Sequence, residues 1–416
     1  MKICFKPSAL LALLIATSFL SSMHAQTISL LYTFTGGVDG ARPLGELLLD
    51  TQNDIYGVTQ DGGALGCVDC GVTYKVTPNG TETVLHAFTG VGDDSSPTDN
   101  VISDGKGNPY GTAFGSNRGS YYGEIYELKD GTSEQSFYRF RKPPDAEYPE
   151  GGLIRDAQGN FYGSTWSGGA HGAGAIYKLS PSGHETVLYS FLLNGRDGYN
   201  PVGPLVQDAD GNLYGVTFYG GSNNGGAVFE VNPANPGKDK VLYSFCSKSK
   251  CSDGENPEGA LAIDQHGNLY GAAIQGGIPQ GNVCDIQFGC GTVFKLNTKT
   301  GAFAVLHHFK GFPSDGAGPN GSLTFDSAGN LYGTTAAGGQ YEDCHSTSVI
   351  GCGIVYKLTP SGKESVLYNF TGGADGGTPL TDLVMDTDGN LYGATSAGGN
   401  TTCSGCGGGV VFRLTP

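Results

Sequence analysis

The sequence predicts an all-β protein, a seven-bladed β-propeller with four antiparallel strands in each blade. Three observations carry this prediction. A short tyrosine-containing motif recurs seven times, each copy lies among four β-rich runs, and the two ends of the chain carry complementary parts of one repeat. Internal periods of this length are typical of propellers, in which each repeat forms one blade.

The recurring motif is N-L-Y-G with small changes. Neighbouring copies lie 52 to 62 residues apart, close to the length of one blade. Their tyrosines are Tyr56, Tyr110, Tyr162, Tyr214, Tyr270, Tyr332 and Tyr392. No other period competes with this one.

The fourth repeat shows the strands of one unit. Short apolar runs predict strands at 203–208, 213–218, 227–231 and 241–245. An Asp-Gly-Asn turn, a glycine pair and a proline-containing stretch separate these runs. Four short β-rich runs split by turn residues are the pattern of a propeller blade.

The termini predict how the ring closes. Residues 29–34 (S-L-L-Y-T-F) match the fourth strand of a unit, and residues 410–414 (V-V-F-R-L) match the third. The last blade therefore lacks one strand, and we expect the N-terminal strand to pair with it. Such closure hides both sheet edges, whereas an open solenoid needs polar caps instead.

These motifs resemble those of a known family. The runs L-Y-x-F-T-G-G-x-D-G-x-x-P, D-x-x-G-N-L-Y-G-x-T-x-x-G-G and V-Y-K-L-T-P, carried by residues 355–360 and 370–399, are similar to the bacterial GloVer tandem repeat. The resemblance covers essentially the whole mature chain. It implies a secreted or surface-displayed bacterial protein and brings no established activity. Because members often end in a separate anchoring segment and this sequence stops at Pro416, we expect release or retention in the periplasm.

Residues 1–25 are interpreted as a secretory signal peptide, which leaves residues 26–416 as one propeller domain. Lys2 and Lys6 precede an apolar run at 10–20, and Ala25 ends a plausible cleavage site. An uncleaved N-terminal anchor is the alternative. Removing the segment leaves 21 of the 23 basic residues against 39 acidic ones, a net charge of −18. This acidity argues against nucleic acid or anionic membrane as a partner.

The cysteines predict disulfides. Cys4 leaves with the signal, and the ten remaining cysteines form five pairs that are close in sequence. They are Cys67/Cys70, Cys246/Cys251, Cys284/Cys290, Cys344/Cys352 and Cys403/Cys406. An even number of cysteines in a secreted chain favours disulfides. The alternative is a zinc ion held by the two C-x-x-C pairs, which belong to neighbouring blades in a closed ring.

Two aspartate motifs recur in every repeat. One is D-x-x-x-P, from Asp39/Pro43 to Asp375/Pro379, interpreted as a turn cap with an axial cation site as the alternative. The other ends the first strand, as at Asp208, and is mostly followed by x-x-G-N. A hairpin turn explains it better than a calcium loop, because the closing glutamate is missing.

Blades 2 to 4 carry aromatic residues that break the repeat. These residues and the polar side chains among them are Trp166, Tyr219, Phe218, Tyr199, Tyr148, Tyr121, Tyr122, Arg118, Arg196 and His171. Most of them belong to the loops between strands two and three and between successive blades, which we expect on one face. Flat aromatic side chains beside polar groups suit a sugar or a partner protein, and packing of the loops against each other is the alternative.

No catalytic motif is evident in the sequence. G-x-S-x-G and H-E-x-x-H are absent, and no carboxylate pair was distinguished from the repeated ones. We therefore expect a monomeric, non-catalytic binding protein for an extracellular glycan or protein surface, with no cofactor and no resident metal. The alternative is a secreted hydrolase or lyase acting on carbohydrate, with calcium as its candidate cofactor.

Overall fold

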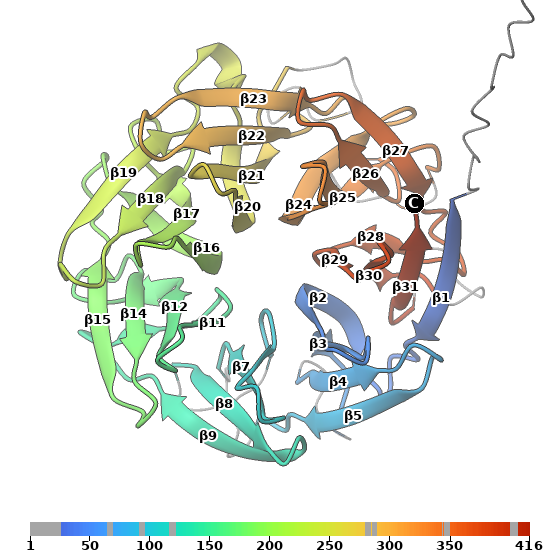
Figure 1. The fold of residues 1–416 in the computed structure, drawn as a ribbon, viewed down its shortest axis with the longest axis horizontal. Helices are drawn as coiled ribbons and strands as arrows, with labels where there is room; N and C mark the ends of the chain where they lie inside the picture. Colours follow the sequence, from blue (N-terminus) through green and yellow to red (C-terminus); the bar gives the residue numbers. More distant parts are fainter. Residues whose placement is uncertain are drawn as a thin grey trace, which may run out of the picture.

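The computed structural model describes residues 26–64, 70–90, 96–115, 122–278, 284, 289–342, 344, 350–399 and 407–416. Seven antiparallel sheets are arranged in a ring around a central axis, as Figure 1 shows. The predicted fold class, a seven-bladed propeller with four strands per blade, is confirmed. No helix in the described residues is long and apolar enough to span a bilayer.

The first four blades follow one another along the chain, each from its inner to its outer strand. Blade 1 consists of β2 (Ala41–Leu49), β3 (Ile55–Asp61), β4 (Val72–Val76) and β5 (Glu82–Ala87). Blade 2 consists of β6 (Ile102–Ser103), β7 (Pro109–Ala113), β8 (Glu124–Lys129) and β9 (Ser133–Arg139). Blade 3 consists of β11 (Ile154–Arg155), β12 (Phe161–Thr165), β14 (Ala175–Leu179) and β15 (Glu185–Ser190), and the short strands β10 (Ala146–Glu147) and β13 (Ser167–Gly168) pair beside it. Blade 4 consists of β16 (Gly198–Gln207), β17 (Leu213–Gly220), β18 (Ala227–Val231) and β19 (Asp239–Ser244).

The remaining blades complete the ring. Blade 5 consists of β20 (Glu255–Ile263), β21 (Asn268–Gln275), β22 (Thr292–Asn297) and β23 (Phe303–His308), preceded by the 3-10 turn η1 (Ser249–Cys251). Blade 6 consists of β24 (Gly316–Phe325), β25 (Leu331–Gly338), β26 (Ile354–Leu358) and β27 (Glu364–Asn369). Blade 7 combines β28 (Gly377–Pro379), β29 (Val384–Met385), β30 (Leu391–Ala397) and β31 (Val410–Thr415) with β1 (Thr27–Thr33).

The ring closes as the termini predicted. β1 pairs antiparallel with β31, with Thr27 opposite Thr415 and Thr33 opposite Val410. β1 thus forms the outer strand of blade 7, which the carboxyl end of the chain leaves one strand short (Figure 1). The unpaired edge of β31 is therefore covered by the other end of the same chain.

The first strand of the fourth repeat is longer than its apolar run indicated. It begins at Gly198 instead of residue 203, because the residues after the D-x-x-x-P aspartate also pair with β17. The ladder is interrupted between Val202 and Val206. Gly203, in this interruption, has a φ of +68°, and a Cβ there would lie 2.6 Å from the backbone of Gly259 in the next blade. Adjacent inner strands therefore approach each other backbone to backbone, which only glycine permits here.

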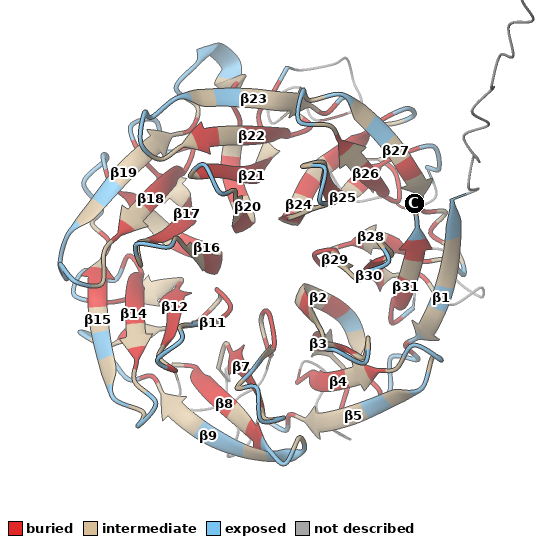
Figure 2. Ribbon diagram, viewed as in Figure 1, coloured by how far each residue is buried: buried red, intermediate tan, exposed pale blue. Residues whose placement is uncertain are grey.

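The core is built from one aromatic pair repeated at every blade interface. A phenylalanine after the fourth strand of one blade meets the aromatic residue of the third strand in the next, with ring centroids 5.0–5.3 Å apart and planes at 60–70°. The pairs are Phe34–Tyr74, Phe88–Tyr126, Phe140–Tyr177, Phe191–Phe229, Phe245–Phe294, Phe309–Tyr356 and Phe370–Phe412. All of these rings are buried, whereas the outer strands carry the exposed positions in Figure 2. Edge-to-face pairs of this kind add about 0.5–1.5 kcal/mol each beyond the burial of their area.

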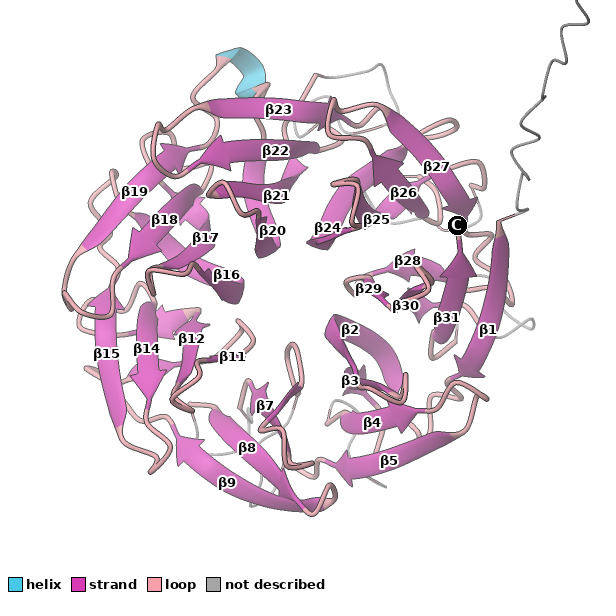
Figure 3. Ribbon diagram, viewed as in Figure 1, coloured by secondary structure: helices cyan, strands magenta, loops and turns pink. Residues whose placement is uncertain are grey.

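The loops between strands two and three and between successive blades share one face, as the sequence analysis predicted. In blade 4 the Gly221 N–H donates to the Asp197 carbonyl over 2.7 Å, and the same bond joins Gly169 to Asp145 and Gly339 to Asp315. Figure 3 shows these loops connecting the strands around the ring. The face that carries them is called the loop face below.

Closure can be tested by moving β1. Deleting residues 26–33 exposes the edge of β31, and we expect a lower melting temperature and aggregation in size-exclusion chromatography. The matched control is a circular permutant that carries β1 after Pro416 on a short turn. Because Thr415 and Thr27 are register partners, this permutant should regain the monomeric elution and the melting temperature of the native chain. Equal stability of all three proteins would contradict closure by β1.

Candidate functional site

The loop face of blades 2 to 4 carries a cluster of aromatic side chains, all of them half-buried. We call this set the aromatic cluster, and it consists of Phe114, Tyr122, Tyr148, Trp166, Tyr199, Phe218 and Tyr219. The sequence analysis named all of these residues except Phe114. The structure brings them together through ring contacts and backbone hydrogen bonds.

Tyr148 is the centre of the first half of the aromatic cluster. Its ring stacks on Phe114 with the centroids 5.0 Å apart and lies 6.0 Å from Tyr122. Its backbone N–H donates to the Tyr122 carbonyl over 2.7 Å. Its φ of +58° is in the left-handed region, so the local backbone turns the side chain away from the regular path of the inner strand.

Trp166 is the centre of the second half. Its ring lies 6.1 Å from Phe218 and 6.4 Å from Tyr219, and Tyr199 stacks on Tyr219 at 5.6 Å. The backbone N–H of Trp166 donates to the Tyr148 carbonyl over 2.9 Å, and this hydrogen bond links the two halves of the aromatic cluster. Asn200 then donates its side-chain N–H to the Trp166 carbonyl over 2.7 Å. The backbone under the indole is thus held from both sides.

The aromatic cluster forms because blades 2, 3 and 4 carry an aromatic residue at a position where the other blades carry none. Phe114, Trp166 and Phe218 each come directly after the second strand's buried Ala or Thr. The equivalent residues of the other blades are Gln60, Ile274, Ala336 and Ser396. The scaffold is therefore common to all blades, while the flat apolar surface belongs to blades 2 to 4.

A cavity of about 210 Å³ lies on the propeller axis, and residues close in sequence to the aromatic cluster line it. Tyr148 lies two residues before Glu150, and Asn200 lies two residues before Val202; both Glu150 and Val202 line the cavity. The cavity is lined by residues from all seven inner strands or the segments that lead into them. Its acidic lining residues are Asp99, Glu150, Glu258 and Asp382.

A network of carboxylates crosses the channel next to this cavity. Glu46 of blade 1 accepts hydrogen bonds from the Ser322 hydroxyl of blade 6 over 2.8 Å and from the Asn100 amide of blade 2 over 3.1 Å. Asp99 accepts the backbone N–H of Glu46 over 3.1 Å and that of Gly152 over 3.0 Å. The network therefore connects blades that are distant in sequence.

Burial and mutual repulsion raise the pKa values of these carboxyl groups. Burial, and then the Glu46 carboxylate, raises the pKa of Asp99 to about 8, and the same two causes raise the pKa of Asp382 well above its usual range. Burial, and then Glu258, raises the pKa of Glu150 to about 7. Burial also raises the pKa of Glu258. Protonated carboxyl groups are therefore favoured in the channel near neutral pH.

The sequence analysis missed this channel, and its statement that no carboxylate pair differs from the repeated ones is wrong. Glu46, Asp99, Glu150, Glu258 and Asp382 are not shared by all repeats. The signal was present, because each lies one to three residues after the proline of D-x-x-x-P, where the repeats share no carboxylate position. Only the ring shows that these positions converge on one axis.

The aspartates of D-x-x-x-P are turn caps, as interpreted. Asp39 accepts the Thr35 N–H over 2.7 Å and the Tyr32 hydroxyl over 2.9 Å, and Asp375 is bound in the same way by Thr371 and Tyr368. Their side chains bond to the outer strand of the preceding blade and are absent from the lining of the axial cavity. The equivalent Asp93 lies outside the described residues.

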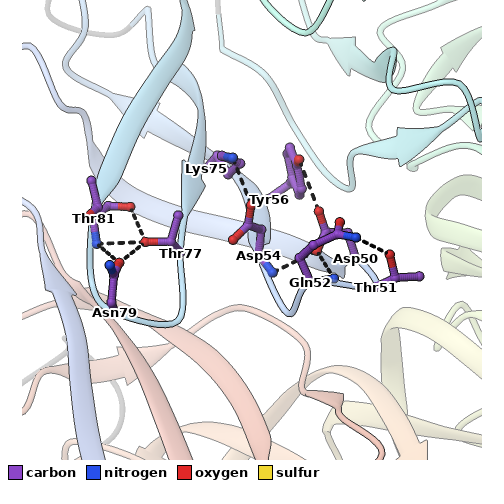
Figure 4. Close-up of polar contacts among 9 residues, drawn as sticks. All are labelled: Asp50, Thr51, Gln52, Asp54, Tyr56, Lys75, Thr77, Asn79 and Thr81. Atoms are coloured by element: carbon purple, nitrogen blue, oxygen red, sulfur yellow. Dashed lines mark hydrogen bonds and ion pairs between the residues drawn. The ribbon is translucent and has the colours of Figure 1, made fainter.

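The strand-ending aspartates close hairpin turns, as predicted. Asp208 accepts the backbone N–H groups of Asp210 and Asn212, the Asn212 amide and the Tyr214 hydroxyl. Figure 4 shows the same turn around Asp50, with Tyr56 as its hydroxyl donor. Burial acts to raise the pKa of Asp208, but the hydrogen bonds outweigh it and the pKa is lowered. These contacts explain both the aspartate and the tyrosine of the recurring motif.

His171 and Arg196, the polar candidate residues that the structure describes, have no ring contact with the aromatic cluster. His171 is exposed and lines a separate cavity of about 500 Å³ beside β15, together with Tyr189 and Lys238. Arg196 is exposed, and its backbone N–H donates to the Asn194 side chain. Arg118 and Tyr121 lie outside the described residues.

Three of the five predicted disulfides lie within the described residues, and all three are formed. They join Cys246 to Cys251, Cys284 to Cys290 and Cys344 to Cys352. Cys70 is also disulfide-bonded. Cys67, Cys403 and Cys406, which belong to the C-x-x-C pairs of the zinc alternative, lie outside the described residues.

The profile of the Gloeobacter/Verrucomicrobia repeat matches residues 65–284 and 285–416 of this chain. No curated protein matches the sequence. Among solved structures, the chain is similar to the extracellular domain of the putative hybrid two component system BT3049 from B. thetaiotaomicron, with a TM-score of 0.57, 13% identity and coverage of 94% of this chain and 41% of that one. The extracellular domain of the putative one component system BT4673 from B. thetaiotaomicron gives a TM-score of 0.53, 11% identity and coverage of 94% and 40%. The chain thus spans about two-fifths of these structures, and the likeness shows the fold alone.

Because the pKa of Glu150 is raised, we predict that Glu150→Gln increases the free energy of unfolding, and that the increase grows with pH. A carboxyl group whose pKa is higher in the folded state stabilises the fold below its unfolded pKa and loses that contribution as the pH rises through about 7. Glutamine carries no charge at either pH. The free energy of unfolding of the variant should therefore be close to that of the native protein near pH 5 and exceed it by up to about 3 kcal/mol near pH 9. Urea unfolding at both pH values measures the difference. The control is Glu342→Gln at an exposed position, and an equal pH response of the two variants would contradict the prediction.

Proposed function

The chain belongs to the Gloeobacter/Verrucomicrobia repeat family, and from that premise we propose that it is an exported, non-catalytic propeller that binds a glycan through the aromatic cluster. The observation that carries this proposal is the gathering of seven half-buried aromatic side chains on one part of the loop face. A fully packed core would bury such rings, and a purely structural surface has no need of them.

The exposed polar atoms of the aromatic cluster support a hydroxyl-rich ligand. Among the described residues, the Trp166 indole N–H and the hydroxyl groups of Tyr148 and Tyr219 have no hydrogen-bond partner. Each of these groups can therefore bond to a ligand while its ring stacks on a sugar face. This combination of apolar surface and a few polar groups is typical of small-ligand sites.

Export is supported by two independent features. The N-terminal segment has the charge and apolar run of a signal peptide, and the described chain contains disulfides, which persist in oxidising compartments. We propose a location outside the inner membrane, either periplasmic or extracellular.

Glycan binding can be tested with Trp166→Ala and Tyr219→Ala. Each variant removes a ring from the aromatic cluster, so we expect at least a tenfold loss of affinity for the polysaccharide that the native protein retains, with an unchanged far-UV spectrum. Affinity electrophoresis on a panel of neutral and acidic polysaccharides measures the loss. Tyr341→Ala is the control, because Tyr341 is 43% exposed and lies in a cysteine-containing loop of blade 6. Absence of retention on every polysaccharide would reject a glycan and favour a protein partner.

A second candidate function, hydrolysis or elimination on a carbohydrate, is supported by Glu150 and Glu258. Both line the axial cavity, and a carboxyl group with a pKa of about 7 can act as a general acid at neutral pH. If the protein turns over a bound polysaccharide, Glu150→Gln should abolish turnover and retain binding. Turnover that survives in this variant would exclude Glu150 as the acid.

A further inference from the structure

The interface between blades 5 and 6 brings a histidine and two carboxylates together. His307 lies in β23, Asp315 lies directly before β24, and Glu364 begins β27. The His307 Nε2 atom is 3.3 Å from the Asp315 Oδ2 atom and 3.6 Å from the Glu364 Oε2 atom. Ligating atoms of all three residues lie within 4.8 Å of one another.

The histidine departs from the residue that most repeats carry: of the other six interfaces, five have a tyrosine at the equivalent position and one has His86, whose D-x-x-x-P aspartate, Asp93, lies outside the described residues. At the equivalent position, five other blade interfaces have a tyrosine whose hydroxyl donates to the aspartate of D-x-x-x-P. These pairs are Tyr32–Asp39, Tyr138–Asp145, Tyr189–Asp197, Tyr243–Asp253 and Tyr368–Asp375. A phenol keeps its proton at neutral pH, whereas a neutral imidazole offers a lone pair to a metal. The replacement changes a hydrogen-bond donor into a ligand and retains the aspartate.

The three side chains are largely buried and held in place. Their exposed fractions are 12% for His307, 4% for Asp315 and 16% for Glu364. Asp315 accepts the backbone N–H groups of Lys310 over 3.0 Å and Gly316 over 2.6 Å, which orient its carboxylate. Among the described residues, the buried Oε1 atom of Glu364 has no hydrogen-bond partner. A buried carboxylate oxygen without a partner is costly, and a cation would remove that cost.

The spacing fits tetrahedral coordination. Zinc binds histidine nitrogen and carboxylate oxygen at about 2.0–2.2 Å, so neighbouring ligand atoms of a tetrahedral site lie roughly 3.4 Å apart. The two distances from His307, 3.3 and 3.6 Å, are close to that spacing. The second group of potential ligands, Cys246, Cys251 and Glu255, is different, because its two sulfur atoms are already joined in a disulfide.

We propose that His307, Asp315 and Glu364 bind one divalent transition-metal ion of the zinc type between blades 5 and 6, with water as the fourth ligand. The set of one imidazole and two carboxylates suits zinc better than calcium, which prefers six to eight oxygen ligands. Burial and the nearby Asp315 carboxylate raise the pKa of Glu364 to about 8, which reflects the uncompensated negative charge of the pair. The exposed Lys310 lies near enough to oppose that charge only in part.

The test uses the exported chain purified without a polyhistidine tag and treated with a chelator. Titration with ZnCl₂ in a calorimeter should show one more bound ion per chain in the native protein than in His307→Tyr, and Co²⁺ should give the visible absorption of tetrahedral coordination. His307→Tyr should lose the site, because it restores the residue found in five other interfaces and so preserves the fold. Glu364→Gln should weaken binding at least tenfold. His184→Ala, which removes an exposed histidine, should leave the number of bound ions unchanged.

The repeat also provides a gain-of-site variant. Tyr138, Asp145 and Glu185 occupy the equivalent places between blades 2 and 3, so Tyr138→His should add one bound ion to the number that the native chain binds. The proposal is overturned if the native chain binds no Zn²⁺, in which case His307 only contacts the two carboxylates. It is equally overturned if His307→Tyr and Glu364→Gln, folded by their thermal melts, bind Zn²⁺ as the native chain does.

Discussion

The edge-to-face aromatic pair between adjacent blades is the interaction on which the structure depends. It occurs at all seven interfaces with nearly the same geometry, and both rings are buried each time. Each blade alone would expose one of these rings on either side. The blades must therefore close into a ring, and β1 must return to blade 7 so that Phe34 can meet Tyr74. The phenylalanine of the recurring L-Y-x-F motif and the aromatic residue of the third strand recur in the sequence because each blade interface needs this pair.

Closure has a second consequence at the axis. The inner strands approach so closely that Gly203 contacts Gly259, and Gly259 contacts Gly321, through backbone atoms. Where a repeat replaces glycine or its neighbours with a carboxylate, that side chain enters a narrow, partly dry channel. Asp99 and Glu150 then acquire raised pKa values, whereas Asp208, in a turn rich in donors, has a lowered one. Their surroundings, and not the residue type, decide the sign of the shift.

The features with functional interest are departures from the repeat. Trp166, Glu150 and His307 each occupy a position that most other repeats fill with a different residue type. A propeller tolerates such changes because each blade packs mainly on its two neighbours. Each of the seven blades therefore offers equivalent positions where one substitution changes the local side-chain chemistry without changing the fold.

The sequence pattern alone predicted the number of blades, the closing strand, three disulfides and the roles of the aspartates in turns. It could do so because each of these features depends on residues close in sequence or on the seven-fold repetition. It also identified most of the aromatic cluster, whose members depart visibly from the repeat. It could not place Glu46 beside Ser322, since that contact joins blades 1 and 6, which are not neighbours in the ring. Nor could it bring Glu364 to His307, 57 residues earlier in the chain. Circular closure brings such residues together, and the spacing of side chains around a closed ring is a property of tertiary structure alone.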